Sequence, residues 1–198
     1  FRSVDNLQTW TVQYPVSDIT DIKFHPTNPN MIYLANTYYW GSVRNHILRS
    51  IDLGLTYTQS SVIVGNNNSS GRISVSSDCN DCVYFASTNG VWKSVDTGIN
   101  FTFLNNPPQS CLGFAVNDLD TSNMVYGYVD VMATQDGGNT FNQVTWWSLG
   151  SSQHGPGNFQ NRYQNSTAYV HADLHPAKCV NGVFYIGTDG TFSKSTDH

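Results

Sequence analysis

The stretch Lys93–Phe103, "KSVDTGINFTF", has near copies elsewhere in the same chain, and this repetition decides the fold. The copies are "RSVDNLQTWTV" from Arg2, "RSIDLGLTYTQ" from Arg49 and "ATQDGGNTFNQ" from Ala133. Each has Ser or Thr, then Asp two residues later, then an aromatic residue five positions after that Asp. The opening residue recurs at intervals of 47, 44, 40 and 61 residues, at Ser3, Ser50, Ser94, Thr134 and Ser195. Such spacing is typical of a repeat protein whose unit has four strands.

A second pattern precedes each of these turns. A short alternating run is followed by a polar turn and then by β-branched and aromatic residues, as in "RISVSSDCNDCVYFAS" (72–87) and "FAVNDLDTSNMVYGYV" (114–129). This pattern indicates two antiparallel strands joined by a loop, and a third and a fourth strand flank the repeated turn. We therefore predict an all-β protein, a β-propeller of four-stranded antiparallel blades. Its approximate blade units within the single domain 1–198 are 11–57, 65–101, 110–141 and 168–198.

The residue types of the repeated turn suit a structural task. The Asp carboxylate can accept hydrogen bonds from the backbone N–H groups of its own turn, and the Gly two residues later suits a positive φ. The aromatic residue that follows can fold back onto the blade. We therefore expect the turn to lie between strands 3 and 4 and to stabilise each blade. Its aspartates are then structural and not catalytic: Asp5, Asp52, Asp96, Asp136 and Asp197.

This turn resembles the Asp-box, or BNR repeat, S-x-D-x-G-x-T-[W/F], of sialidases, sortilin-type receptors and glycoside hydrolase family 74. The third copy matches except for Asn100 in the Thr position, and the first has Leu7 in place of Gly. The second half, with "YVHADLHP" (169–176), also resembles secreted bacterial glycosyl-hydrolase-like propellers, in which an H-x-D-x-H element precedes a G-x-D-G-G turn. Thr191 stands where that turn has its second Gly. The resemblance covers essentially the whole chain and implies a sialidase-superfamily propeller.

Composition restricts the partners. Only 9 residues are Lys or Arg and the net charge is -5, so no basic surface for nucleic acid is expected. No run of 18 apolar residues is present, so we expect no membrane-spanning helix. The chain starts at Phe1 and not at Met, and it starts and stops inside a repeat. We therefore expect about four blades' worth of a larger propeller, or a ring that a partner completes.

The cysteines and the glycosylation sequons fit the secreted or cell-surface location that we expect. Four cysteines could form two disulfides or remain free thiols, and we expect either a local clip across a turn or pairing with the other two: Cys79, Cys82, Cys111 and Cys179. No second C-x-x-C or C-x-x-H pair supports zinc, and no cofactor is expected. Sequons stand at Asn67, Asn68, Asn100 and Asn165.

Two segments could carry chemistry. On a strand, His171, Asp173 and His175 would point to one side, where they could bind a metal or transfer protons, or form a buried hydrogen-bonded trio. The segment 146–169 is the longest irregular one, and loops of this length are commonly functional. Aromatic side chains here and in a loop of the same face could stack on sugar rings or pack against neighbouring blades: Trp146, Trp147, Phe159, Tyr163, Tyr38, Tyr39 and Trp40.

A sialidase site, with its arginine triad and Tyr–Glu pair, is excluded because the chain has five Arg and no Glu. A glycosidase that uses two Asp stays open, with the candidates Asp21, Asp130, Asp173 and Asp189. We favour a non-catalytic propeller module, secreted or surface-exposed, with a structural, adhesive or carbohydrate-binding role. Its partners would be glycans, other extracellular proteins or further copies of itself. The alternative is a glycoside hydrolase completed by blades outside this segment.

Overall fold

The computed structural model describes residues 1–13, 19–36, 46–60, 71–147 and 169–196, and its elements there are β-strands in four antiparallel sheets. The strands are β1 (Ile19–Phe24), β2 (Ile32–Asn36), β3 (His46–Ser50), β4 (Thr58–Gln59), β5 (Arg72–Val75), β6 (Val83–Ser87), β7 (Gly90–Ser94), β8 (Thr102–Asn105), β9 (Gly113–Val116), β10 (Met124–Gly127), β11 (Val131–Thr134), β12 (Asn142–Gln143), β13 (Leu174–Val180), β14 (Val183–Thr188) and β15 (Phe192–Ser195). Within these ranges no helix is both long and apolar enough to cross a membrane.

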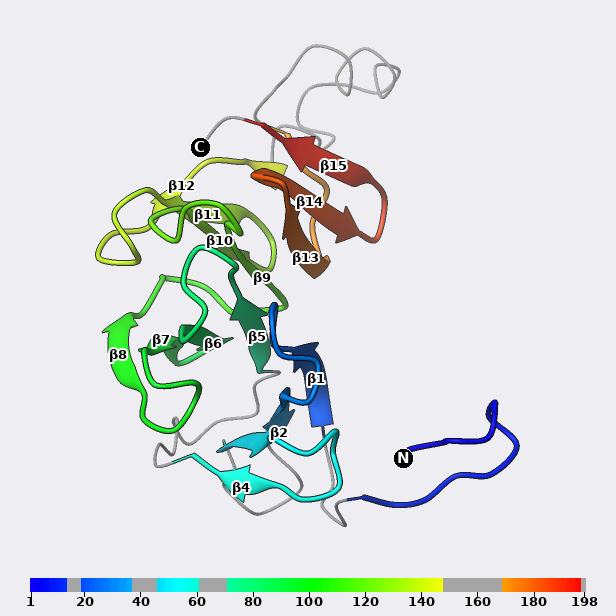
Figure 1. Cartoon of the computed structure of the whole chain (residues 1–198). Helices are drawn as coiled ribbons and strands as arrows, with labels where there is room; N and C mark the ends of the chain where they lie inside the picture. The colour runs from blue at the N-terminus through cyan, green and yellow to red at the C-terminus, as the bar shows by residue number, and fades with distance from the viewer. Residues whose placement is uncertain (14–18, 37–45, 61–70, 148–168, 197–198) are drawn as a thin grey trace.

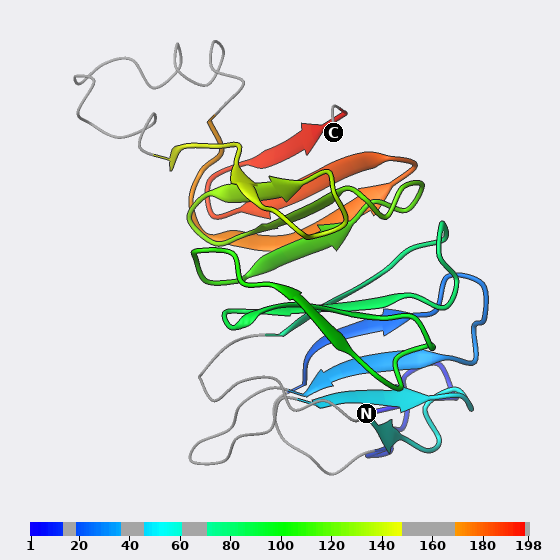
Figure 2. The same ribbon diagram turned by 90° about the vertical axis from the view of Figure 1, so that its left-hand side faces the viewer.

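Each sheet is one blade of a propeller. Blade 1 is β1–β4, blade 2 is β5–β8, blade 3 is β9–β12 and blade 4 is β13–β15, and in each blade consecutive strands are hydrogen-bonded neighbours. Figure 1 shows the blades following one another in an arc, with their first strands β1, β5, β9 and β13 along its inner side. Figure 2 shows the same sheets from the side as successive layers. This arrangement confirms the predicted all-β propeller with the repeated turn between the third and fourth strands.

Stacking of the blades explains the burial of the strands. The second strands β2, β6 and β10 are buried along their whole length. Each is covered on both faces, either by a neighbouring blade or by an apolar cluster of its own blade. The described fourth strands are short and more exposed, which suits the outer edge of a sheet. Three of the apolar clusters lie between neighbouring blades, and Tyr33, Tyr126 and Leu174 are fully buried members of them. The core of the molecule is therefore divided among the blade-to-blade contacts.

The repeated turn is formed in all four of its described copies with the same hydrogen bonds. The opening hydroxyl donates to Oδ1 of the Asp at 2.7–2.8 Å. The backbone N–H of the fourth residue after the Asp donates to Oδ1 at 2.9 Å, and its side chain donates to Oδ2 at 2.5–2.7 Å. Asn100 makes this last bond with its amide in place of the usual Thr hydroxyl. The aspartates thus bond within their own turns, as the sequence predicts.

The backbone of this turn passes through two left-handed residues. The second is the Gly position, with φ of 80°, 82° and 94° at Gly54, Gly98 and Gly138, and Leu7 adopts 68° in the first copy. The first is occupied by Leu53 in blade 1, with φ of 59°, and by Thr97 in blade 2. The N–H of this first residue donates to a carbonyl in the first turn of the same blade, at 2.8–2.9 Å in each of blades 1, 2 and 3. The repeated turn therefore closes each of blades 1, 2 and 3 on itself.

The left-handed conformation of Leu53 yields a stability prediction. Its side chain is 45% exposed, so the residue is held there by the turn and not by packing. Asn tolerates a left-handed φ better than Leu does, and we expect Leu53→Asn to stabilise the protein by about 0.5–1 kcal/mol. Thermal unfolding should show a midpoint about 1–4 °C higher. Leu55→Asn, at an exposed position of the same turn without a positive φ, is the control and should give no gain.

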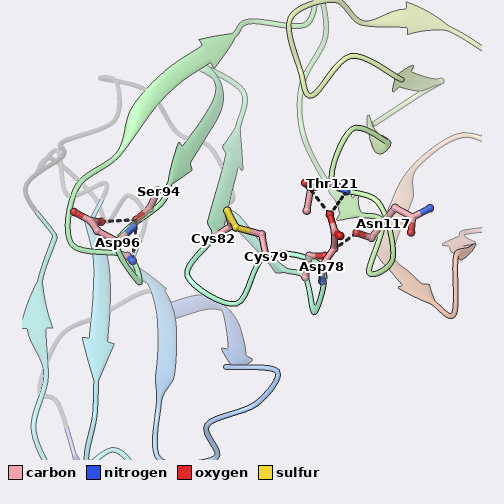
Figure 3. Close-up of a disulfide and its surroundings, with 9 residues drawn as sticks. Asp78, Cys79, Cys82, Ser94, Asp96, Asn117 and Thr121 are labelled. Carbon is pink, nitrogen blue, oxygen red and sulfur yellow. Dashed lines mark hydrogen bonds between the residues drawn. A yellow bond between two sulfur atoms is a disulfide. The ribbon is translucent and has the colours of Figure 1, made fainter.

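The first turns of neighbouring blades are joined by carboxylates. Asp78 of blade 2 accepts hydrogen bonds from the N–H and hydroxyl of Thr121 in blade 3, at 3.0 and 3.2 Å. Asp118 of blade 3 accepts from the N–H groups of Asn181 and Gly182 in blade 4, both at 2.8 Å. Figure 3 shows the first contact beside a disulfide of the same turn. A row of such contacts links blades 2, 3 and 4 at one end of the propeller.

The disulfide joins Cys79 and Cys82 within the first turn of blade 2. Of the two expected arrangements, the local disulfide across a turn is therefore the one observed. Cys111 and Cys179 are buried free thiols, and their pairing in a disulfide is not observed. They lie in different apolar clusters, on either side of blade 3, which keeps their sulfur atoms apart. Burial raises the pKa of Cys111 to about 12 and that of Cys179 to about 11. Both are therefore protonated, inert thiols at neutral pH.

Candidate functional site

The two ends of the propeller differ in what they expose. The repeated turns and the first turns of the blades lie at one end, where the aspartates accept hydrogen bonds from their own turn or from the neighbouring blade. The other end carries the turns between second and third strands and the links from one blade to the next. We call it the connection face, and in blades 3 and 4 it is described at residues 128–130, 144–147, 169–173 and 189–191. The candidate site lies there.

Asp130 organises the blade 3 part of this face. Its Oδ1 accepts a hydrogen bond from the backbone N–H of Trp147 at 2.6 Å, and its Oδ2 accepts one from Nε2 of Gln143 at 3.0 Å. The Gln109 side chain donates to the Asp130 carbonyl oxygen at 2.7 Å. Trp146 and Trp147 are 43% and 41% exposed. The carboxylate thus fixes the backbone of two neighbouring indole side chains that remain open to solvent.

Tyr128, in the same turn, meets the segment that leads into blade 4. Its carbonyl oxygen accepts a hydrogen bond from the N–H of Leu174 at 2.8 Å. The negative charge of Asp173, together with a hydrogen bond to it, raises the pKa of the Tyr128 hydroxyl, and the charge of Asp189 contributes in the same direction. The Asp173 carboxylate therefore lies beside the Tyr128 phenol group, and the charge of Asp189 acts on the same group. Turn 128–130, which also contains Asp130, connects these carboxylates to Trp146 and Trp147.

Two histidines complete the cluster. Nε2 of His175 lies 2.5 Å from Oδ1 of Asp189, and both side chains are about half exposed. His171 has its Nδ1 3.1 Å from the carbonyl oxygen of Ala172. A Cβ atom on Gly190 would stand 2.6 Å from the His171 ring, so this Gly permits the close approach of the turn to the imidazole. Residues 189 and 190 therefore lie against His175 and His171.

The predicted alternation of the histidine segment is not observed. β13 begins at Leu174, and Asp173 just before it has a φ of 59°. Asp is among the few residues that adopt this conformation readily, and it breaks the period of two on which the prediction depended. His175 lies on the strand and pairs with Asp189, whereas His171 and Asp173 precede the strand. The three side chains do not form a buried trio.

The carboxylate of Asp21 lies in a different environment from those of blades 3 and 4. It makes an ion pair with Nζ of Lys23 at 2.8 Å and accepts a hydrogen bond from the N–H of Ile73 at 2.8 Å. The bond from Ile73 connects blade 1 to blade 2. Of the four Asp candidates, only Asp173 and Asp189 are brought to the same group, and Asp130 lies in the adjoining turn.

Several predicted site residues lie outside the described residues. These are the aromatic residues Tyr38, Tyr39, Trp40, Phe159 and Tyr163, the repeated-turn Asp197, and the sequons at Asn67, Asn68 and Asn165. The remaining sequon residue, Asn100, is exposed, and its amide donates to Asp96. In the described part of the chain, no three His, Cys, Asp or Glu side chains are grouped so that they could hold a metal ion.

A cleft of about 790 Å³ lies between blades 3 and 4, and Thr145 and Val170 line it where it meets the connection face. Val144, Phe184 and Lys194 are among the residues that line it. In blades 2 and 3 the corresponding space is closed by the aromatic residue of the repeated turn, Phe101 or Phe141, which packs into the cluster towards the preceding blade. We therefore assign the cleft to blade packing and not to the candidate site.

The sequence indicated the individual carboxylates but not their partners. Tyr128 was not predicted as a site residue. The only sequence signal for it is that a Tyr directly follows a buried strand and stands two residues before Asp130. The bond of Asp130 to Trp147 spans 17 residues, and that of His175 to Asp189 spans 14. Chemically, the arrangement offers exposed aromatic surface beside carboxylates, imidazoles and a phenol hydroxyl.

No protein-family model matches the chain, and no curated protein is similar to it in sequence. Solved structures do match its fold. The GH74 enzyme of Niastella koreensis superposes on 89% of this chain and 30% of its own, with 19% identity and a TM-score of 0.57. The extracellular domain of the putative one component system BT4673 from B. thetaiotaomicron superposes on 98% of this chain and 23% of its own, with 13% identity and a TM-score of 0.62.

YCF48 from Cyanidioschyzon merolae superposes on 91% of this chain and 56% of its own, with 14% identity and a TM-score of 0.55. The chain thus spans less than a third of the first two structures and about half of the third. Identities this low establish likeness of fold and no shared activity. The chain has the propeller fold found in glycoside hydrolase family 74 and in other propeller proteins.

Proposed function

We propose that this chain is an extracellular, non-catalytic propeller module that binds carbohydrate at the connection face of blades 3 and 4. The observation that carries the proposal is the turn 128–130, which joins two kinds of surface. Through Asp130 it positions Trp147, and through Tyr128 it adjoins Asp173. Exposed indole rings offer flat apolar surface for a sugar ring, and neighbouring carboxylates and imidazoles can bond its hydroxyl groups. Such a site suits an adhesive or structural role in which the glycan is held and not cleaved.

The environments of the carboxylates support a non-catalytic role. A glycosidase needs a carboxylic acid that keeps its proton near neutral pH, and burial in a water-excluding pocket is the usual way to achieve this. The side chain of Asp189 is 55% exposed and pairs with His175. Asp130 accepts two hydrogen bonds, and Asp21 is paired with Lys23. These carboxylates are held as hydrogen-bond acceptors.

Extracellular location is part of the proposal. The Cys79–Cys82 disulfide is the kind of bond that persists in an oxidising compartment. The fold likeness to an extracellular domain of B. thetaiotaomicron supports the same location. Mass mapping of the native protein from its host would show the disulfide intact. A reduced pair in freshly isolated protein would argue for a reducing compartment.

The binding proposal is tested with a panel of soluble polysaccharides in affinity electrophoresis, followed by calorimetry on any ligand found. We expect Trp147→Ala to weaken binding by at least about tenfold, since loss of a central aromatic contact commonly costs more than 1.4 kcal/mol. Trp10→Ala is the matched control, because Trp10 is similarly exposed but belongs to the first repeated turn. Equal loss in the two variants, or no binding to any member of the panel, would contradict the proposal.

One observation favours glycoside hydrolysis as the second candidate. Asp173 and Asp189 both lie near Tyr128, and Asp173 has a left-handed backbone of the kind often found at active sites. The fold likeness to a GH74 enzyme agrees with this reading. Release of reducing sugar by the purified chain, abolished in Asp173→Asn while the polysaccharide still binds, would establish the hydrolase. Binding without release would leave the non-catalytic module in place.

A further inference from the structure

The proposed carbohydrate site combines carboxylates with exposed indole rings. Asp130, Asp173 and Asp189 are the carboxylates of the connection face in blades 3 and 4. Trp146 and Trp147, beside Asp130, are open to solvent. A carboxylate attracts a cation by its charge, and the face of an indole ring attracts one by its quadrupole. Both kinds of group therefore favour a positively charged ligand over a negatively charged one.

The lysines of these blades lie at a distance from the carboxylates. In the part of blades 3 and 4 that the structure describes, the Lys and Arg residues are Lys178 and Lys194. Both are paired with Tyr185 in the sheet, four residues along the chain from Asp189. At about 3.3 Å per residue, this separation is about 13 Å, which exceeds a Debye length of about 8–10 Å. The two ammonium groups therefore do little to neutralise the connection face.

Two arginines elsewhere in the chain do not reverse this balance. Arg72 donates to the carbonyl oxygens of Leu112, at 2.7 Å, and of Thr20, at 3.3 Å, so its guanidinium group is held by backbone. Arg162 is the one Lys or Arg in the sequence of residues 148–168, which contains no carboxylate. The three carboxylates of the face outnumber both arginines together, and the chain as a whole has a net charge of -5.

Two of the carboxylates keep acceptor positions for a ligand. Oδ1 of Asp189 lies 2.5 Å from Nε2 of His175, and the Asp189 side chain is 55% exposed, so its Oδ2 can accept further hydrogen bonds. Asp173 accepts a hydrogen bond from the Tyr128 hydroxyl, and a carboxylate has about four acceptor positions in all. An ammonium group has three donors and no acceptor, so it matches groups that only accept.

We propose that the connection face of blades 3 and 4 selects glycans whose sugars carry free, protonated amino groups over neutral and acidic glycans. Such selectivity rests on the carbohydrate binding proposed above, at the same site. One sugar ring lies on an indole face, and an ammonium group on that ring or a neighbouring one donates to Asp173 or Asp189. A neutral sugar keeps the stacking contact and lacks the ionic one. A uronic acid meets like charge.

Calorimetry with three tetrasaccharides tests this selectivity. They are β-1,4-linked glucosamine, its fully N-acetylated counterpart and galacturonic acid. At about pH 6 a sugar amine is protonated, like an α-amino group with its pKa of about 7.7–8.0. We expect the glucosamine oligomer to bind about tenfold more tightly than the N-acetylated one, a difference of about 1.4 kcal/mol. One cation–π contact and one exposed ion pair supply a difference of this size. The galacturonic acid oligomer should not bind detectably.

Substitution of the carboxylates locates the selectivity. Asp173→Asn and Asp189→Asn should each lower the ratio of the two affinities by about threefold, because one ion pair is lost. Asn also adopts the left-handed φ of Asp173 readily. Asp81→Asn is the matched control, since it changes the net charge equally at an exposed position of the first turn of blade 2, at the opposite end. An equal fall in the control would assign the preference to net charge and overturn the proposal.

The selectivity and the carbohydrate binding fail in different ways. Equal affinity for the glucosamine and N-acetylated oligomers would overturn the selectivity and leave carbohydrate binding in place. The same holds if a neutral polysaccharide binds and the glucosamine oligomer does not. No binding of any oligomer or polysaccharide to the wild-type chain would overturn both. Tighter binding of the glucosamine oligomer, weakened in Trp147→Ala and with its preference reduced in Asp189→Asn, is the expected result.

Discussion

Replacement of Gly98 by Ala is expected to lower the free energy of unfolding by about 3 kcal/mol and the thermal midpoint by about 6–12 °C. Two effects add. Gly98 has a φ of 82°, which costs an L-residue about 1–2 kcal/mol. A Cβ there would also stand 3.0 Å from Cε1 of Tyr33, a fully buried ring between blades 1 and 2 that has little room to move. The substitution therefore strains a blade interface as well as a turn.

Gly137→Ala is the matched control for this experiment. Gly137 also has a positive φ, of 74°, but no atom lies within 4 Å of its Cβ position. The equivalent position in blade 2 is filled by Thr97 at a φ of 58°, so the control measures the backbone cost alone, about 1 kcal/mol. Equal losses in the two variants would show that the Tyr33 contact contributes nothing. A Tyr33→Ala background should remove the excess cost at Gly98.

Acid is expected to destabilise the protein as pH falls from about 4 to 2, and Asp96→Asn should remove part of that dependence. Hydrogen bonds from the Asn100 backbone, and from Ser94 and the Asn100 amide, lower the pKa of Asp96 from 3.8 to about 2. Similar bonds, led by the hydroxyls of Thr9 and Thr56, lower the pKa of Asp5 and Asp52 to about 2. The unfolded chain therefore binds protons at a higher pH than the folded chain does.

The sign of the effect follows from these depressed pKa values. The stabilisation by each carboxylate is fully present above the unfolded pKa and is lost as pH falls through the folded one. Urea unfolding should be measured at pH 7, 4, 3 and 2. At pH 7 the free energy of unfolding should be lower for Asp96→Asn than for the wild type, and the two values should converge near pH 2. Ser94→Ala keeps the carboxylate, so it should lose stability at every pH and retain most of the acid dependence. Parallel curves for wild type and Asp96→Asn would contradict the assignment.

Local features of the fold could be predicted from the sequence because their partners are close along the chain. Asp96 finds Ser94, Ile99 and Asn100 within four residues, so the residue types alone determine the turn. The strands follow from short runs of β-branched and aromatic residues. The alternation argument failed where Asp173 adopted a left-handed φ, since an Asp in a sequence does not reveal which of its allowed conformations is used.

Contacts between distant segments could not be predicted in the same way. Arg72 donates to the carbonyl oxygens of Leu112, at 2.7 Å, and of Thr20, at 3.3 Å, and so joins three blades. Every residue has a carbonyl oxygen, so the sequence carries no signal for this choice of acceptor. The same holds for the candidate site, where Asp130 bonds the backbone N–H of Trp147. Only the arrangement of the blades reveals such pairs.

The hydrogen bond from each repeated turn to the first turn of its own blade has a consequence for how such chains change in evolution. Leu53 to Asn30, Thr97 to Asp81 and Gly137 to Ser122 are all closed within a single unit. A gene duplication or deletion that spans one whole unit keeps both partners of this bond together, whereas bonds between blades, such as that from Thr121 to Asp78, change partners. The number of units can therefore drift between descendants, while the sequence within a unit stays constrained by its own closure.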